Sequence, residues 1–189
     1  HLTVVNRAHV IKRLAENRDD LVIMSLVPPD MALEFLPFLN YPIVAVAPPG
    51  HPLGKASKLN LRDLEPYPLL VREAGSGTRK ACEEYFQQKR VHFAQKHEIA
   101  SLEAVREGVV AGLGLALLPR HSVTQELANG RLLELPVEEL PLYRSWCVVH
   151  ARGKRLSPVA QAFLDYIRSE RTQISALGQT FSGYCPTPH

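Results

Sequence analysis

The chain has 189 residues, enough for one domain or two small lobes. Hydrophobic residues make up 46% and charged residues 22% of it, which is average for globular domains and excludes disorder and low complexity. The net charge of +3 comes from scattered lysines and arginines, without the dense basic stripe of a nucleic-acid-binding surface. The longest largely apolar run, residues 109–119, is far shorter than the roughly 20 residues of a membrane helix. We therefore expect no membrane association and, because Arg7 interrupts the first apolar stretch, no signal peptide.

Three cysteines, Cys82, Cys147 and Cys185, form an odd set with no close pair. A disulfide framework is therefore not expected, and a reducing, cytoplasmic location fits this usage better. No Cys-x-x-Cys or His-x-x-x-His spacing occurs, so we expect neither a metal site nor a cofactor.

The N-terminal part of the chain predicts a strand–helix–strand unit. Residues 2–5 favour a strand, and Asn6 suits the N-cap of a helix that ends near Asn17. Residues 21–24 form a continuous apolar run, which is typical of a buried parallel strand. Such a unit indicates a parallel sheet. Further extended segments are expected at residues 35–39 and 43–47.

A second set of alternating strands and helices follows a break at residues 48–52, where prolines remove backbone donors. Ser101 suits the N-cap of one helix, and Gly112 its C-terminal end. We expect a helical turn at 61–64, strands at 68–71, 97–99, 115–118, 131–135 and 143–150, and helices at 78–89, 102–111, 122–128 and 158–170.

This order of elements predicts an α/β fold with two lobes, each built on βαβ units and joined by two extended crossings. Lobe I would take residues 1–48 and 143–170, and lobe II residues 49–142. Residues 171–189, rich in Ser, Thr, Gly and Pro, are predicted to be a C-terminal tail. A cleft at the carboxyl ends of the parallel strands is where small ligands usually bind.

The clearest local signal is the segment 71–79, which joins a buried strand to a helix N-terminus through Gly75. Free backbone N–H groups and the helix dipole favour an anion at such a terminus. Ser76 and Thr78 add hydroxyl donors, and Arg79 adds a charge-assisted one. The segment predicts a carboxylate, sulfate or phosphate site, and a capped helix with a glycine turn is the alternative. It lacks the frame of a P-loop.

Other candidate residues are fewer. Arg7 lies at a helix start after the first strand, where a plain solvated arginine is the alternative. Ser101 can contact a ligand while it caps its helix. No catalytic residue is predicted, because Ser76 has no assignable histidine and acid partner. Cys82 lies in the first turns of a helix, which leaves a redox sensor open.

Taken in order, several motifs resemble the effector-binding domain of LysR-type transcriptional regulators. They are the junction Val4-Val5-Asn6-Arg7 and the segments 14–24, 46–53, 72–79, 111–119, 148–150 and 156–164. The resemblance covers about residues 2–170. Within the family the sequence is most similar to the regulators of carbon-fixation (Calvin cycle) operons.

The resemblance implies two Rossmann-like lobes, as in periplasmic binding proteins, with a small anionic metabolite in the cleft between them. In carbon-fixation regulators the effector is a phosphorylated sugar, phosphoglycolate or a nucleotide. The family's ligand contacts fall on Arg7, Ser76, Gly77, Thr78, Arg79, Ala100 and Ser101. The resemblance also implies a homodimer or homotetramer. The family's DNA-binding winged helix-turn-helix, and the first strand and helix of lobe I, are not found in this sequence.

Two other functions share some of these features. A solute-binding protein of the same fold, serving a transporter, would also bind a small anion between two lobes. A small hydrolase or transferase would need a base beside Ser76 or Cys82, and the sequence offers none.

Overall fold

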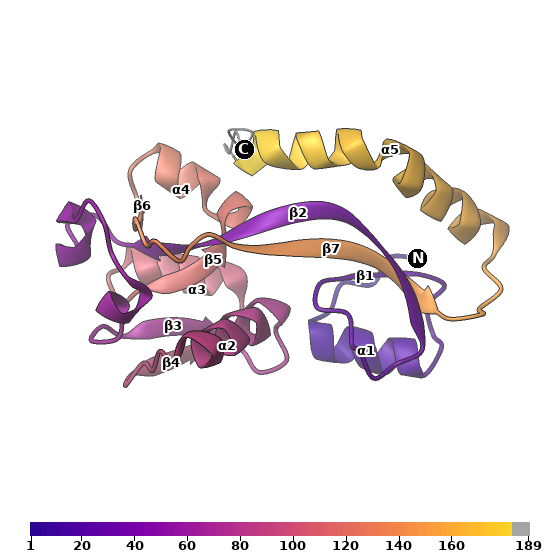
Figure 1. Cartoon of the computed structure of the whole chain (residues 1–189), viewed down its shortest axis with the longest axis horizontal. Helices are drawn as coiled ribbons and strands as arrows, with labels where there is room; N and C mark the ends of the chain where they lie inside the picture. Colours follow the sequence, from indigo (N-terminus) through magenta and orange to yellow (C-terminus); the bar gives the residue numbers. More distant parts are fainter. Residues whose placement is uncertain (183–189) are drawn as a thin grey trace. The chain divides into compact units, whose positions relative to one another are not determined.

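The computed structural model describes residues 1–182, which divide into two compact units. Unit 1 comprises His1–Tyr41 and the segment from Arg144 onward, and unit 2 comprises Pro42–Tyr143. The sequence places the corresponding boundaries at residues 48 and 143. Two long strands, β2 (Leu33–Ala47) and β7 (Leu142–Ala151), each contribute residues to both units (Figure 1).

Unit 1 is built around antiparallel pairing of β1 (Val22–Met24) with β7, in which Val22 lies opposite Val149. The helix α1 (Arg7–Ala15) packs against β1. Its one buried side chain is Leu14, which joins a core with residues of β1 and β7. The two extended segments expected at 35–39 and 43–47 are one continuous strand, β2.

The strand predicted at residues 2–5 is not formed, and the prediction was wrong. Leu2 and Val4 are 90% and 86% exposed, and the segment pairs with no strand among residues 1–182. A β-rich segment becomes a strand only when a neighbour accepts its ladder hydrogen bonds. The parallel sheet expected for this lobe is also not formed among the described residues. The strand expected at residues 2–5 does not exist to pair with β1, and β1 instead pairs with β7 in the antiparallel sense.

The end of the chain also differs from prediction. The helix that begins at Pro158, α5, continues to Ser182, so the tail predicted from residue 171 is helical over its first part. Ala160, Leu164 and Ile167 are buried on one side of this helix, and Ile174 extends the packing beyond the predicted end. Serine and threonine are tolerated in helices, and the prolines that suggested a tail lie outside the described residues.

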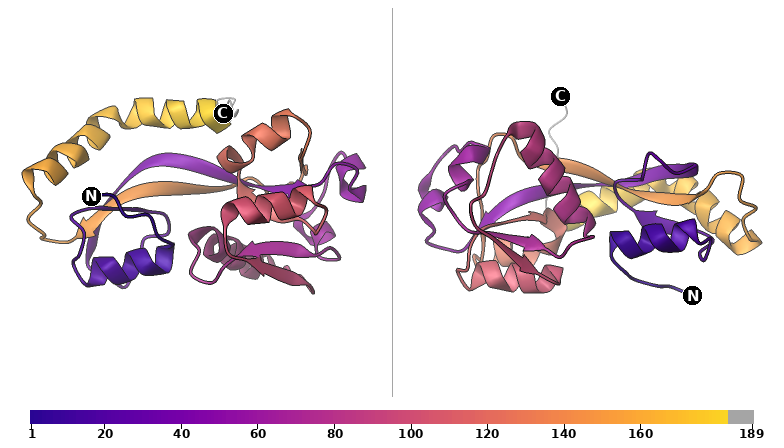
Figure 2. Two further views of the ribbon diagram at one scale, coloured as in Figure 1. Left: turned by 180° about the vertical axis from the view of Figure 1, so that it is seen from behind. Right: turned by 90° about the horizontal axis from the view of Figure 1, so that it is seen from below.

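Unit 2 has the alternating order that the sequence predicts. The strand β3 (Leu69–Arg72) pairs in parallel with β4 (Lys96–Ile99), and Leu69 forms a parallel bridge with Leu115 just before β5 (Ala116–Pro119). The helices α2 (Gly77–Lys89) and α3 (Leu102–Val110) connect these strands and pack against β3 (Figure 2). The strand β3 therefore lies between β4 and β5, with a helix leading out of each parallel strand of the pair.

The remaining elements close unit 2. β5 and β6 (Leu133–Glu134) both pair with β2 in the antiparallel sense. The seven residues from Tyr41 to Ala47 at the end of β2 are all buried, as expected for a strand covered on both faces. The short elements are the single turns η1 (Pro52–Lys55), η2 (Leu61–Leu64) and η3 (Arg120–Ser122), and the helix α4 (Thr124–Ala128).

The core of unit 2 fixes β3 and α3 in place. It joins Val44 and Val46 of β2, Leu70 of β3, and Val105 and Val109 of α3. Each of these side chains is at most 3% exposed. Burial of this kind stabilises a domain by about 1.5–3 kcal/mol per large apolar side chain. The sheet edge on which the two helices begin is thus held by a well-packed interior.

Candidate functional site at the carboxyl edge of strands β3 and β4

Two helix N-termini meet at one edge of the unit 2 sheet. The parallel register pairs Arg72, the last residue of β3, with Ile99, the last residue of β4. The first strand leads through residues 73–76 into α2, and the second leads through Ala100 and Ser101 into α3. Because the carboxyl ends of parallel strands share an edge, both N-termini lie there. Each offers backbone N–H groups and the positive end of a helix dipole.

Both N-termini are capped by serine. Ser76 Oγ accepts a hydrogen bond from the Arg79 N–H at 3.5 Å, and Ser101 Oγ accepts one from the Ala104 N–H at 3.0 Å. The N-cap role predicted for Ser101 is therefore confirmed. A capping hydroxyl uses a lone pair, so its own O–H proton is left to donate elsewhere. The left-handed φ of +89° at Gly75 turns the chain into α2 at little steric cost.

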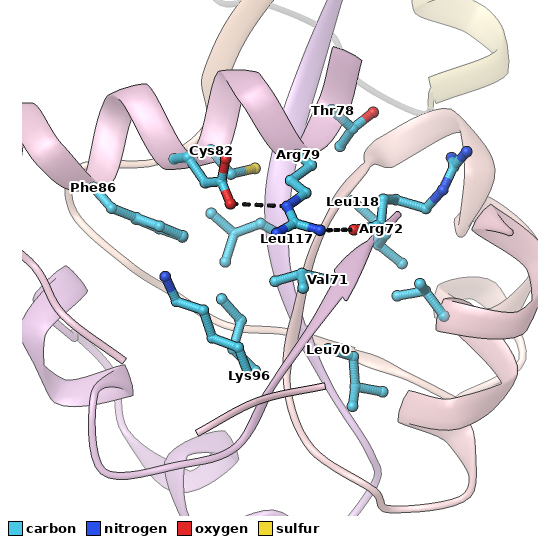
Figure 3. Close-up of a pocket in the computed structure, with 13 residues that line it drawn as sticks. Leu70, Val71, Arg72, Thr78, Arg79, Cys82, Phe86, Lys96, Leu117 and Leu118 are labelled. Carbon is cyan, nitrogen blue, oxygen red and sulfur yellow. Dashed lines mark hydrogen bonds and ion pairs between the residues drawn. The ribbon is translucent and has the colours of Figure 1, made fainter. Parts of the chain in front are cut away.

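Arg79 is the main cation of this edge, and its guanidinium is already engaged. Nε forms an ion pair with Glu83 at 2.8 Å, and one terminal nitrogen donates to the Arg72 carbonyl oxygen at 3.0 Å (Figure 3). The same nitrogen forms an ion pair with Glu98. Hydrogen bonding to the two carboxylates raises the pKa of Arg79 above its ordinary value. The side chain is 23% exposed, so solvent reaches it.

Carboxylates take up several other donors at this edge. The pKa of Glu98 lies below its ordinary value, chiefly because Arg79 and then the backbone N–H of Ala74 hydrogen-bond its carboxylate. The pKa of Glu103 is also lowered, because its carboxylate accepts its own backbone N–H at the start of α3. Arg72 pairs with Glu73 at 2.7 Å. The edge therefore has the donors of an anion site, with side-chain carboxylates as their partners.

A small apolar crevice lies beneath Arg79. It is lined by Thr78, Arg79, Cys82 and Phe86 of α2 and by strand residues that include Leu70 and Leu118 (Figure 3). Its free space is about 20 Å³, room for a single water molecule, whereas ligand pockets usually measure about 300–1,000 Å³. This crevice is a gap in the core packing, and the solvent-facing edge above it is the better candidate for a ligand.

Arg7 lies in unit 1, at the first position of α1, where Asn6 caps the helix by accepting the His9 N–H at 3.2 Å. The Arg7 guanidinium donates to the Leu26 carbonyl oxygen from Nε at 3.1 Å and from a terminal nitrogen at 2.5 Å. Leu26 has a left-handed φ of +53°. Arg7 thus has a structural contact in the loop that follows β1.

The structure brings six of the seven predicted site residues to one edge of unit 2 and places Arg7 in unit 1. Ser76, Gly77, Thr78 and Arg79 surround the start of α2, and Ala100 and Ser101 precede α3. The sequence interpretation missed the acidic partners Glu83 and Glu98. The spacing of four residues from Arg79 to Glu83 was available as a helical ion-pair signal. Glu98 could be found only from the register of β3 with β4.

A larger groove of about 500 Å³ lies in unit 1, between residues 37–40 of β2 and residues Arg171, Thr172, Ser175 and Ala176 of α5. None of the predicted site residues lines it.

The sequence also raised the questions of a redox-active cysteine, a metal site and a membrane-spanning helix. Cys82 and Cys147 are buried, each 6% exposed, and neither forms a disulfide within the described residues. Burial raises the pKa of Cys147 above its ordinary value. Buried thiols of this kind are poor redox sensors. Among residues 1–182, no three side chains of His, Cys, Asp or Glu gather as a metal site would require. In the same part of the chain, no helix has both the length and the apolar character to cross a bilayer.

Comparison with known proteins identifies the class. The family model "LysR substrate binding domain" matches residues 1–172. The chain is 40% identical over 174 residues to the HTH-type transcriptional activator CmpR of Synechocystis, covering 92% of this chain and 57% of CmpR. It is 38% identical over 173 residues to a RuBisCO operon transcriptional regulator of Allochromatium vinosum, with the same coverage. The regulatory domain of Synechocystis CcmR, solved in complex with 2-PG, superposes with a TM-score of 0.85 at 34% identity, covering 93% of this chain and 84% of that chain.

The chain therefore belongs to the LysR substrate-binding domain family, as the motifs predicted, and its α/β fold is the periplasmic-binding-protein-like fold of that family. Two of its relatives are named as RuBisCO operon transcriptional regulators. The chain spans 57% of the length of CmpR, a little over half. These relatives are transcriptional regulators, neither enzymes nor transport proteins, so the solute-binding and hydrolase alternatives gain no support.

Proposed function

We propose that this chain is the effector-sensing domain of a cytoplasmic regulator of carbon-fixation operons, and that it binds a small phosphorylated metabolite. The observation that carries the proposal is that two serine-capped helix N-termini and Arg79 share one sheet edge. The similar CcmR domain was solved with 2-PG, which supports a small effector in this family. The names of the relatives support the link to carbon fixation.

The donors of this edge suit a phosphate group. The Ser76 hydroxyl and the first-turn backbone N–H groups of α2 would donate to phosphate oxygens. The Ser101 hydroxyl, which also acts on the Glu103 carboxylate, would donate to the phosphate in its place. Arg79 would add a charge-assisted hydrogen bond from the terminal nitrogen that now pairs with Glu98. Thr78 adds a third hydroxyl. We assign Arg7 a second contact with the same effector, as the resemblance to the family implies.

In the whole protein, we propose that effector binding biases the arrangement of subunits in a homodimer or homotetramer. A winged helix-turn-helix outside this sequence would then carry the change to DNA. Such a response requires the effector to bind one conformation more tightly than the other.

Isothermal titration calorimetry tests the ligand site. The wild-type chain, Arg79→Ala and Lys80→Ala are titrated with 2-phosphoglycolate at one ionic strength. Loss of a charged hydrogen-bond partner costs about 1.5–3 kcal/mol, so Arg79→Ala should weaken binding about 10–150-fold. Lys80 lies on the same helix and pairs with Glu84, so Lys80→Ala is the matched control for loss of a positive charge.

The outcome separates binding from folding. Circular dichroism melts of each variant show whether the fold is retained, and Arg79→Lys keeps the charge but loses the two-nitrogen geometry. Equal affinity of Arg79→Ala and wild type would overturn the assignment of Arg79. Arg7→Ala is measured in the same way, with its melting temperature reporting separately on the lost contact with Leu26.

A further inference from the structure

The partners of Arg79 are not equivalent. Glu83 is four residues further along the same helix and pairs with Nε, a geometry that the helix itself maintains. Glu98 comes from a different element, β4, and pairs with the terminal nitrogen that also contacts the Arg72 carbonyl oxygen. One contact therefore depends on local helix geometry and the other on how β4 lies beside β3.

The carboxylate of Glu98 has the surroundings expected of a bound anion. It accepts a hydrogen bond from the Arg79 guanidinium, and the backbone N–H of Ala74, in the loop that leads into α2, helps to keep its pKa below the ordinary value. A guanidinium and a loop N–H beside a helix N-terminus are the donors that a phosphate oxygen would use. The Glu98 side chain is 53% exposed, so it can move into solvent without leaving a buried charge behind.

We propose that Glu98 is an internal competitor for the effector and so helps to set its affinity. This inference rests on the proposed function, because it concerns the same anion site. An incoming anion has to displace the Glu98 carboxylate from Arg79 and from the Ala74 N–H. A monoanionic carboxylate replaces one carboxylate by another and gains little at this contact. A phosphate dianion brings a second charge and more acceptor oxygens, so it gains from the exchange.

Glu83 has the opposite role in this scheme. Its contact with Nε can persist while a ligand occupies the terminal nitrogen, because the two carboxylates use different nitrogens of one guanidinium. Glu83 is therefore a positioning residue that orients Arg79 toward the sheet edge. The two carboxylates should then respond to the same substitution with opposite signs, which a general effect of negative charge could not produce.

The size of the effect follows from the exposure of the pair. Ion pairs open to solvent contribute little, so the competitor should weaken binding moderately rather than block it. Replacing the Glu98 carboxylate by an amide should tighten the binding of a phosphorylated ligand about two- to fivefold. The displaced carboxylate also repels the bound ligand, so the relative gain should be at least as large for a dianion as for a monoanion.

The test is calorimetric titration of the full 189-residue chain and three variants, Glu98→Gln, Glu83→Gln and Glu84→Gln, with 2-phosphoglycolate and with glycolate. Glu84 pairs with Lys80 on the same helix, so Glu84→Gln controls for removing one negative charge near the edge. We expect Glu98→Gln to bind both compounds more tightly, with a gain for 2-phosphoglycolate at least as large as the gain for glycolate. Glu83→Gln should bind no more tightly than wild type, and Glu84→Gln should change little.

Each alternative outcome has a definite meaning. If Glu98→Gln binds 2-phosphoglycolate as wild type does or more weakly, Glu98 positions Arg79 and the competitor is rejected, while the proposed function stands. An equal gain in Glu98→Gln and Glu84→Gln would also reject it, in favour of general electrostatics. If neither wild type nor any variant binds either compound, the proposed function fails and the competitor with it.

Discussion

The helices α1 and α2 begin alike and are held very differently. Each follows a capping residue, Asn6 or Ser76, and each carries an arginine in its first turn. The helix α2 buries three residues, Ala81, Cys82 and Phe86, and follows the strand β3, which has a neighbouring strand on each side. By contrast, α1 buries Leu14 alone and follows an exposed segment. The capping residue determines where a helix begins, whereas burial determines how firmly that start is placed. A sheet edge that binds a ligand needs a helix start that is firmly placed, and the buried residues of α2 provide this.

The substitution Leu14→Ala gives the sharpest test of this contrast. Because Leu14 is the one buried residue of α1, its truncation should cost about 3 kcal/mol of the free energy of unfolding and should release α1 from β1. Urea unfolding followed by circular dichroism gives the energy, and hydrogen exchange shows whether the amides of α1 lose protection.

The matched substitution in unit 2 is Val105→Ala in α3. This helix also buries Val109, so its amides should stay protected. If the amides of α1 remain protected from exchange in Leu14→Ala, the few contacts of α1 hold it more firmly than their burial indicates. The contrast between α1 and the helices of unit 2 would then be wrong.

Gly114→Ala tests the rigidity of the strand that supports the site. A Cβ at Gly114 would lie 2.4 Å from the Pro68 carbonyl oxygen, which accepts the Leu115 N–H at 2.8 Å. The Pro68 carbonyl group is backbone and cannot rotate away, and Gly114 itself has a φ of +157°, so the substitution should cost about 2 kcal/mol. Gly112→Ala is the control, since a Cβ there meets no atom within 4 Å.

Gly112 has a φ of +82°, so its substitution should cost only the left-handed strain of about 1 kcal/mol. Urea unfolding of the two variants measures the difference between them. Equal losses would mean that the start of β3 adjusts to the added methyl group, contrary to the rigid edge that we describe.

Sequence patterns predicted unit 2 well because its signals are local and agree with its packing. The caps at Ser76 and Ser101 and the apolar periodicity of α3 depend on neighbours a few residues away. Residues 2–5 have an equally good strand composition, yet the described chain offers them no partner. The continuity of β2 likewise depends on pairing with β5 and β6, residues that are distant in sequence.

The candidate site shows the same division between local and distant information. The donor groups of residues 76–79 could be predicted, because a helix N-terminus and its hydroxyl donors follow from the segment itself. The ion pair between Arg79 and Glu98 joins residues separated by 19 positions and depends on the β3–β4 register. The sequence thus indicates the donors of the site, and only the fold reveals which carboxylate they hold.

The weakest of the expected effects concerns the second anchor of α1, the ion pair of Arg13 with Asp19, whose two hydrogen bonds measure 2.5 and 2.9 Å. The hydrogen bond from Arg13 holds the pKa of Asp19 below its ordinary value of 3.8. A carboxylate whose folded pKa is depressed stabilises the fold above its unfolded pKa and loses that contribution as the pH falls through the folded value. Asp19→Asn should therefore have a lower free energy of unfolding than wild type at pH 7. The loss should be smaller than the losses expected for Leu14→Ala and Gly114→Ala.

That difference should shrink steadily below about pH 4, because wild type then loses the same carboxylate charge. Urea midpoints of wild type and Asp19→Asn between pH 3 and pH 7 measure it, and Asp30→Asn in an exposed loop controls for loss of charge alone. A difference that stayed constant with pH would show that Asp19 acts through packing rather than through its charge. In that case α1 would be held by the burial of Leu14 and by the contact of Arg7 with Leu26, and the contrast with α2 would be greater than the ion pair suggests.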